Sequence, residues 1–136
     1  MVEIDDLKEA ISKEDYELRG GEIVLLWTGA SDYNDEPRYL TEHPGMVDES
    51  AEWLIDRGVQ VMGIDAPGCD LPPKEMMERR DPWPCHRLFQ KREYWHIENL
   101  ANMGGIPKAH GFTVSVLPLH WVGATGTHIR AVAILD

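Results

Sequence analysis

The stretch Asp48-Glu-Ser-Ala-Glu-Trp-Leu-Ile-Asp-Arg-Gly-Val-Gln-Val-Met-Gly-Ile64 decides the fold class. Its first part places apolar side chains on one face of a helix, which we expect over residues 48–57 with Asp48 as N-cap and Gly58 as a left-handed C-cap. Its second part, residues 59–64, predicts a buried strand, and a similar apolar run covers residues 22–27. A strand, helix, strand unit of this kind is parallel and right-handed, so the sequence predicts an α/β fold.

The remaining segments extend this α/β pattern along the chain. We expect a short amphipathic helix over residues 3–11, a loop over 32–45, a short helix over 74–80, and strands over 94–98, 112–119 and 129–135. Two prolines, Pro82 and Pro84, should break the chain after the short helix. No internal repeat or linker divides the sequence, so we expect a single domain over residues 1–136.

Charge and hydropathy exclude several classes of function. The 24 acidic residues outnumber the 13 basic ones, and a formal charge of -11 would repel phosphate backbones and anionic lipids, so we expect neither a nucleic acid nor a membrane as partner. No apolar run approaches the roughly 20 residues of a membrane span. The acidic start of the chain, Met1-Val-Glu-Ile-Asp-Asp6, lacks the features of a signal peptide. We therefore expect a cytoplasmic protein.

The two cysteines, Cys69 and Cys85, lie sixteen positions apart. This spacing does not match the C-x-x-C pattern of redox and zinc motifs. A cytoplasmic setting argues against a disulfide, so we expect two buried free thiols.

The segment 86–98 contains the densest group of polar side chains in the sequence. On the expected strand, His96 and Glu98 lie two residues apart and face the same side, and His86 precedes them across a turn. Imidazole nitrogen and carboxylate oxygen suit zinc or manganese, and a hydrolytic site keeps one coordination position open for water. Either histidine could therefore join Glu98 at a metal ion. The alternative is a salt-bridged or solvated surface, since residues 91–93 are all charged.

Asp65 ends the second expected strand. Ligand sites in open α/β sheets gather beyond the carboxyl ends of strands, which makes this carboxylate a candidate neighbour of the site. The alternative is that Asp65 caps a turn by accepting hydrogen bonds from backbone N–H groups.

Several blocks of the sequence occur in the same order in a known family. They are Ile23-Val-Leu-Leu-Trp-Thr-Gly29, His43-Pro-Gly45, Ala51-Glu-Trp-Leu54, Gly63-Ile-Asp-Ala-Pro67, His86-Arg-Leu88, Ile97-Glu-Asn-Leu100, Pro118-Leu119, Gly123-Ala-Thr-Gly126 and Arg130-Ala-Val-Ala133. Along these blocks, which span nearly the whole chain, the sequence resembles the cyclase family of metal-dependent hydrolases. That family includes kynurenine formamidases and isatin hydrolase.

The resemblance implies roles for the candidate residues. His86 and Glu98, twelve positions apart, match the family's two C-terminal metal ligands, which makes His96 a neighbour of the ligands and not a ligand itself. The family's other ligands and its catalytic histidine come from an H-x-G-T-H-x-D-x-P-x-H motif, which this sequence lacks. No catalytic residue is therefore assigned. The implied fold is an α/β domain of the swivelling β/β/α type that is incomplete at its N-terminus.

The function that the resemblance implies is metal-dependent hydrolysis of a small amide, completed by the missing N-terminal half. The metal would be zinc or manganese, and the substrate an N-formyl aromatic amide such as N-formylkynurenine or a cyclic amide. Absent N-terminal strands would leave sheet edges and an apolar face open, so we expect a homo-oligomer or association with an N-terminal partner segment. The alternatives are a catalytically inactive binding or scaffold protein with the same fold, and a truncated fragment.

Overall fold

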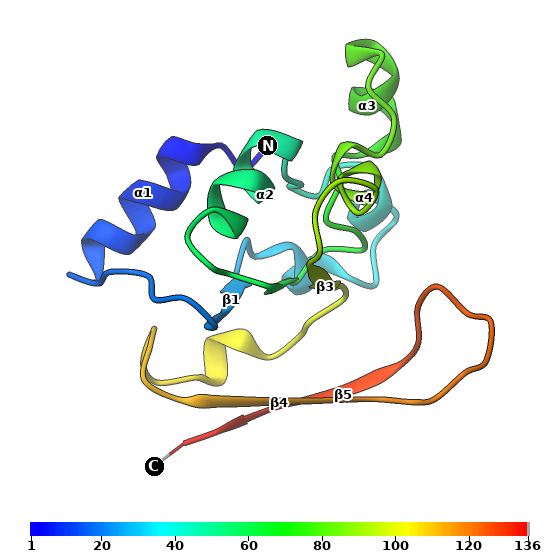
Figure 1. The fold of residues 1–136 in the computed structure, drawn as a ribbon. Helices are drawn as coiled ribbons and strands as arrows, with labels where there is room; N and C mark the ends of the chain where they lie inside the picture. The colour runs from blue at the N-terminus through cyan, green and yellow to red at the C-terminus, as the bar shows by residue number, and fades with distance from the viewer. Residues whose placement is uncertain (136) are drawn as a thin grey trace. The chain divides into compact units, whose positions relative to one another are not determined.

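The computed structural model describes residues 1–135 and divides them into two compact units. The first unit is Met1–Met103 and the second is Gly104–Asp136. Figure 1 shows the course of the chain through both. Helices and strands alternate in the first unit, which confirms the predicted α/β class. The expectation of one domain over residues 1–136 stays a prediction.

The expected elements follow one another in the predicted order, and four further short helices, η1, η2, α4 and η3, lie between them within the described residues. In chain order they are α1 (Ile4–Lys13), β1 (Ile23–Leu26), η1 (Ala30–Tyr33), η2 (Pro37–Leu40), α2 (Asp48–Ile55), β2 (Val61–Ile64), α3 (Pro73–Arg79), α4 (Pro84–Leu88), β3 (Trp95–Ile97), η3 (Met103–Gly105), β4 (Thr113–Pro118) and β5 (Ile129–Ile134). The segment expected as a plain loop forms the 3₁₀ helices η1 and η2. The second proline after α3 starts α4 instead of only breaking the chain, because proline fits the first turn of a helix.

The strand, helix, strand unit is confirmed. β1, β2 and β3 form a parallel sheet in that order, with Val24 opposite Met62 and Met62 opposite His96. Gly58 takes the predicted left-handed conformation at φ 84°, but it is not the C-cap, because α2 ends at Ile55 and Asp56 follows as its C-cap. The predicted N-cap is wrong: Val47 occupies that position and Asp48 begins α2, where its charge favours the positive end of the helix dipole.

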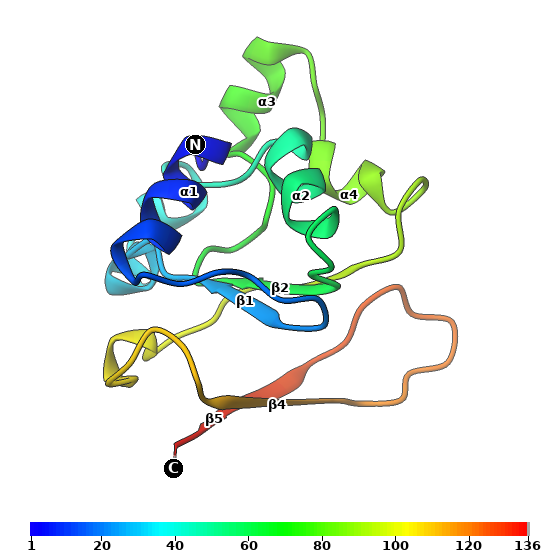
Figure 2. The same cartoon turned by 60° about the vertical axis from the view of Figure 1, so that its left-hand side comes forward.

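The core of the first unit lies between the sheet and three helices. Figure 2 shows α1, α2 and α4 on the same side of this sheet. Leu7 from α1, Leu54 from α2 and Leu88 from α4 pack in one buried cluster with Met62 of β2. Full burial of one such side chain contributes about 1.5–3 kcal/mol. The face of β3 that carries His96 therefore points into the packed side of the unit.

The second unit consists mainly of an antiparallel hairpin. β4 pairs with β5 from Thr113 opposite Ile134 to Pro118 opposite Ile129. None of the described residues 104–135 is buried, and several large apolar side chains are exposed, among them Leu117, Trp121 and Val122. A two-stranded hairpin with no buried side chains of its own has little apolar burial to stabilise it.

No helix within residues 1–135 has the length and apolar character that crossing a bilayer requires.

Candidate metal centre

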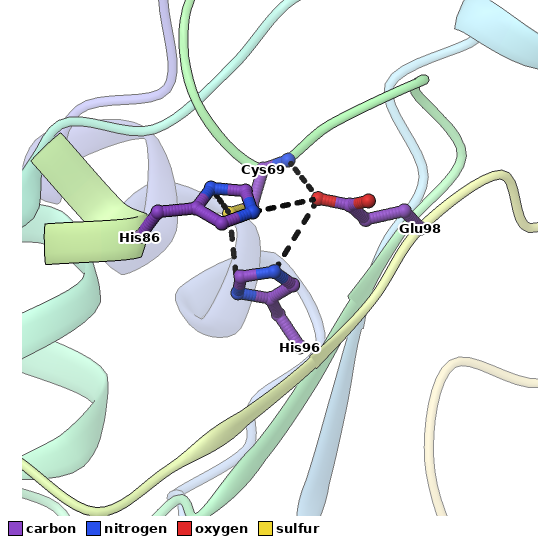
Figure 3. Close-up of side chains that lie close together, drawn as sticks. All are labelled: Cys69, His86, His96 and Glu98. Atoms are coloured by element: carbon purple, nitrogen blue, oxygen red, sulfur yellow. Dashed lines mark hydrogen bonds and ion pairs between the residues drawn. The ribbon is translucent and has the colours of Figure 1, made fainter. Parts of the chain in front are cut away.

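Four side chains from three neighbouring segments converge at one point of the first unit. Cys69 lies in the loop after β2, His86 on α4, His96 on β3, and Glu98 directly after β3 (Figure 3). One ligand atom from each of them lies within 4.8 Å of the corresponding atoms of the other three. Parallel pairing of β2 with β3 brings the segments that follow both strands to the same sheet edge.

His86 is held in position by a carboxylate. Its Nδ1–H donates to Oδ2 of Asp70, and Asp70 also accepts a hydrogen bond from the backbone N–H of Cys85 at 2.6 Å. The Asp70 carboxylate raises the pKa of His86 by bonding to its ring, and burial opposes this effect only in part. With Nδ1 engaged, Nε2 is the nitrogen that faces Glu98, 3.9 Å from Oε1. A carboxylate behind one ring nitrogen is the usual arrangement for a metal-binding histidine.

His96 lies deeper than His86. Its Nε2 lies 3.4 Å from Oε1 of Glu98, and its Nδ1 lies 3.3 Å from Sγ of Cys69. Burial lowers the pKa of His96 to about 4, with a further contribution from the neighbouring His86. The imidazole is therefore neutral at pH 7, which is the form that can bind a metal ion.

Cys69 and Glu98 are joined through the backbone. The N–H of Cys69 donates to Oε1 of Glu98 at 3.3 Å, and the Cys69 side chain is buried. A hydrogen bond with Cys85, and then burial, raises the pKa of the Cys69 thiol. Both cysteines are free and buried, as predicted.

Asp65 is not part of this group. Its carboxylate accepts hydrogen bonds from the backbone N–H of Thr28 at 2.8 Å, the hydroxyl of Thr28 at 2.7 Å, and the backbone N–H of Gly29 at 2.9 Å. These contacts correspond to the turn-capping alternative, with the difference that the capped turn follows β1 and not β2. Asp65 thus fixes the exit of the chain from β1.

The donor set fits a divalent metal ion. One thiol, two imidazoles and one carboxylate are all groups that bind zinc, and the Asp70 contact supplies the support that such ligands need. Among the charged residues 91–93, Arg92 forms an ion pair with Asp56 at 2.8 Å and is not one of the four grouped donors. The structure thus brings together His86, His96 and Glu98, as the sequence suggested, and adds Cys69 and Asp70.

Sequence reasoning missed Cys69 and Asp70. The available signal was their place directly after the second expected strand, where ligands gather in α/β sheets. A second group of possible donors, formed by Cys69, Asp70 and Cys85, is fully buried. The fold and the site together define an α/β protein with a candidate centre for a divalent metal ion.

Comparison with known proteins agrees with this class. The "Putative cyclase" family matches residues 1–71. Isatin hydrolase of Roseibium aggregatum is 28% identical over 137 residues, which cover 96% of this chain and 51% of that protein. Cyclase-like protein 2 of Arabidopsis thaliana is 33% identical over 96 residues, which cover 69% of this chain and 32% of that protein. The chain belongs to the cyclase family.

Solved structures show the same fold. An isatin hydrolase bound to the product analogue thioisatinate superposes with a TM-score of 0.83 at 25% identity, over 99% of this chain and 53% of the other. Isatin hydrolase A from Ralstonia solanacearum gives a TM-score of 0.82 at 23% identity, over 98% of this chain and 52% of the other. The chain spans about half the length of the isatin hydrolases that it matches.

Proposed function

We propose that this chain forms part of a metal-dependent hydrolase for a small amide. The observation that carries the proposal is the pairing of His86 with Glu98, in which Nε2 lies 3.9 Å from Oε1 while Asp70 holds the opposite ring nitrogen. This pair has the spacing that the cyclase family uses for two of its metal ligands. The similarity to isatin hydrolases adds support from an independent source.

His86 and Glu98 have separate roles in this proposal. His86 would bind the ion through Nε2, since its Nδ1–H donates a hydrogen bond to the Asp70 carboxylate, which fixes the tautomer. Glu98 would supply an oxygen ligand and a negative charge next to a divalent cation. A zinc or manganese ion bound there would polarise a substrate carbonyl and lower the pKa of water toward roughly 7.

A cyclic amide is the first substrate class to test. The relatives of this chain include proteins named for the hydrolysis of isatin, which contains a five-membered cyclic amide. The second class is an N-formyl aromatic amide, exemplified by N-formylkynurenine, which other members of the family hydrolyse. Both reactions add water across an amide C–N bond, so the same metal ligands serve either one.

The proposal includes a second polypeptide segment. The sequence lacks the H-x-G-T-H-x-D motif that supplies the family's remaining ligands, and the chain spans about half of its relatives. Trp27 after β1 and Trp95 on β3 are each about 60% exposed, which leaves apolar surface that a partner could cover. The partner would be an N-terminal family segment, or a second copy of this chain if the open surface pairs with itself.

Complementation tests this function. The chain is co-expressed with the N-terminal segment of an isatin hydrolase that carries the motif, and the purified complex is assayed with isatin and with N-formylkynurenine in the presence of zinc or manganese. We expect amide hydrolysis by the complex and little by the chain alone, because two ligands hold an ion weakly and this sequence lacks the motif that carries the family's catalytic histidine. His86→Ala and Glu98→Gln should abolish the restored activity.

His128→Ala is the matched control, because this histidine lies in the second unit and outside the donor group. Its activity in the complex should equal that of the unaltered chain. A complex that forms and binds metal but hydrolyses neither amide would favour an inactive binding or scaffold protein of the same fold. Activity that survives the loss of Glu98 would contradict the ligand assignment.

A further inference from the structure

We infer that two buried tyrosines, Tyr39 and Tyr94, are positioning residues for the metal centre, each holding the chain next to one of the two proposed ligands. Tyr39 acts on Glu98 and Tyr94 acts on His86, in both cases through a neighbouring residue of the chain. The inference rests on the proposed function for the ligand roles of His86 and Glu98. It adds the contacts that keep these two side chains in place before an ion binds.

The hydroxyl of Tyr39 holds the residue that follows Glu98. It donates to Oδ1 of Asn99 at 2.9 Å, and Tyr39 is only 8% exposed. The backbone of Asn99 is left-handed, with φ 57°, a conformation that asparagine adopts more readily than most residues. The N–H of Asn99 also donates to the carbonyl oxygen of Ala66 at 2.8 Å. The residue after Glu98 is therefore held at its side chain and at its backbone, which limits where the Glu98 carboxylate can lie.

The hydroxyl of Tyr94 holds the residue that precedes His86. It donates to the carbonyl oxygen of Cys85 in the first turn of α4, and Tyr94 is fully buried. The N–H of Cys85 donates to Oδ1 of Asp70, whose other oxygen accepts the hydrogen bond from the His86 ring. Both backbone groups of Cys85 are thus engaged by side chains, and one of these side chains also fixes the imidazole.

These contacts matter because the elements that carry the ligands are short. α4 has five residues and β3, which Glu98 follows, has three. An isolated helix below about 12–15 residues is marginal in water, so α4 depends on contacts with the rest of the unit. Burial is the main cause that raises the pKa of both Tyr39 and Tyr94, so each hydroxyl keeps its proton and acts as a donor.

The competing explanation is that the two hydroxyls only stabilise the fold. Zinc alone serves as the probe, and its affinity for the full chain is measured by competition with a chromophoric chelator. Tyr39→Phe and Tyr94→Phe keep the ring and should each weaken zinc binding about 3–10-fold, the effect of one ordinary hydrogen bond. Tyr16→Phe is the matched control, because it removes a hydroxyl that donates to Glu22, outside the donor group. It should leave the affinity for zinc unchanged.

Double variants separate positioning from stability. With Glu98 already changed to Gln, Tyr39→Phe should weaken zinc binding no further, whereas Tyr94→Phe should keep its full effect. With His86 changed to Ala, the pattern should reverse. Asn99→Gly keeps a left-handed backbone but removes the acceptor, so it should reproduce the result of Tyr39→Phe. Effects that simply add in both backgrounds would show a general loss of stability and would overturn the inference.

Amide hydrogen exchange in the metal-free chain tests the same point without zinc. The N–H of Cys69 donates to Oε1 of Glu98 at 3.3 Å, and the N–H of Cys85 donates to the carboxylate behind the other ligand. Tyr39→Phe should speed exchange at Cys69 and not at Cys85, and Tyr94→Phe should do the reverse. Equal changes at both amides, or none at either, would refute the positioning roles.

The exchange result is distinguishable from the fate of the proposed function. Selective exchange together with an inactive complementation complex would refute only the hydrolase. An active complex in which the two tyrosine variants change both amides equally would refute only this inference.

Discussion

The two units of the chain differ in how their side chains are buried. In the first unit, helices and a parallel sheet enclose a cluster that includes Leu54, Met62 and Tyr94, each at most 1% exposed. In the second unit, two longer strands of six residues each form a hairpin, and no described residue of that unit is buried. Strand formation is thus common to both, and the difference lies in packing. The candidate metal centre lies in the unit whose packing can hold side chains in fixed positions.

Truncation of one side chain in each unit should give the largest difference in the free energy of unfolding. Leu54→Ala removes a fully buried side chain of α2 and should lower the free energy of unfolding by about 2–5 kcal/mol, because a cavity remains. Leu117→Ala on β4, where the side chain is 73% exposed, should change it by less than about 0.5 kcal/mol. Urea unfolding followed by circular dichroism measures both values. Equal effects would show that the hairpin is packed against a partner in solution.

Replacing one glycine of each unit with alanine should give the second-largest difference in stability. A Cβ on Gly45 would lie 2.1 Å from the carbonyl oxygen of Asp70, so Gly45→Ala should force the two backbones apart and cost about 1–3 kcal/mol. Gly126→Ala in the second unit meets no atom within 4 Å and serves as the control, with an unfolding free energy close to that of the unaltered chain. Thermal unfolding reports both. Because Asp70 orients His86, Gly45→Ala should also weaken zinc binding, which Gly126→Ala should not do.

The smallest difference between the two units is expected in how stability depends on pH when a histidine of each unit is replaced. Burial lowers the pKa of His96 to about 4 from its usual 6.5, so its contribution to stability is complete above about pH 6.5 and is lost as pH falls toward 4. In metal-free protein, His96→Gln should remove about 1–2 kcal/mol of the stability change between pH 7 and pH 5. The raised pKa of His86 acts in the opposite direction, and it is present in both proteins.

His128→Gln in the second unit is the control for this comparison, and its pH profile should match that of the unaltered chain. Urea unfolding at a series of pH values, with a chelator present, provides the curves. A profile of His96→Gln that parallels the unaltered chain would mean that His96 titrates normally and is not buried as described.

The sequence predicts most of the architecture because local patterns encode it. Apolar runs predicted the strands, and Gly58 predicted a left-handed residue after α2, although the helix itself ends earlier, at Ile55. Asp48 was misjudged by one position as an N-cap, since the choice between adjacent residues depends on backbone geometry. The helix α4 was missed, because a proline that breaks one helix can also start the next.

The candidate site was predictable only in part. His86 and Glu98 came from the family resemblance, and His96 from its alternation with Glu98 on one strand. Cys69 joins them only because β3 pairs with β2, a contact between strands separated by two helices. No local pattern specifies that pairing. Asp70 was missed for the same reason, although its position next to Cys69 places it near the same sheet edge.

The shortness of β3 gives the register of the sheet an unusual importance. Only Trp95, His96 and Ile97 form this strand, and His96 lies opposite Met62 on the helix-covered face. A slip by one residue would turn His96 to the opposite face and bring Trp95 or Ile97 in its place, because successive side chains alternate. The four donors can meet in one register only. A bound ion would therefore favour the correct pairing of β3 with β2, since it stabilises the chain in this register and not in the slipped one.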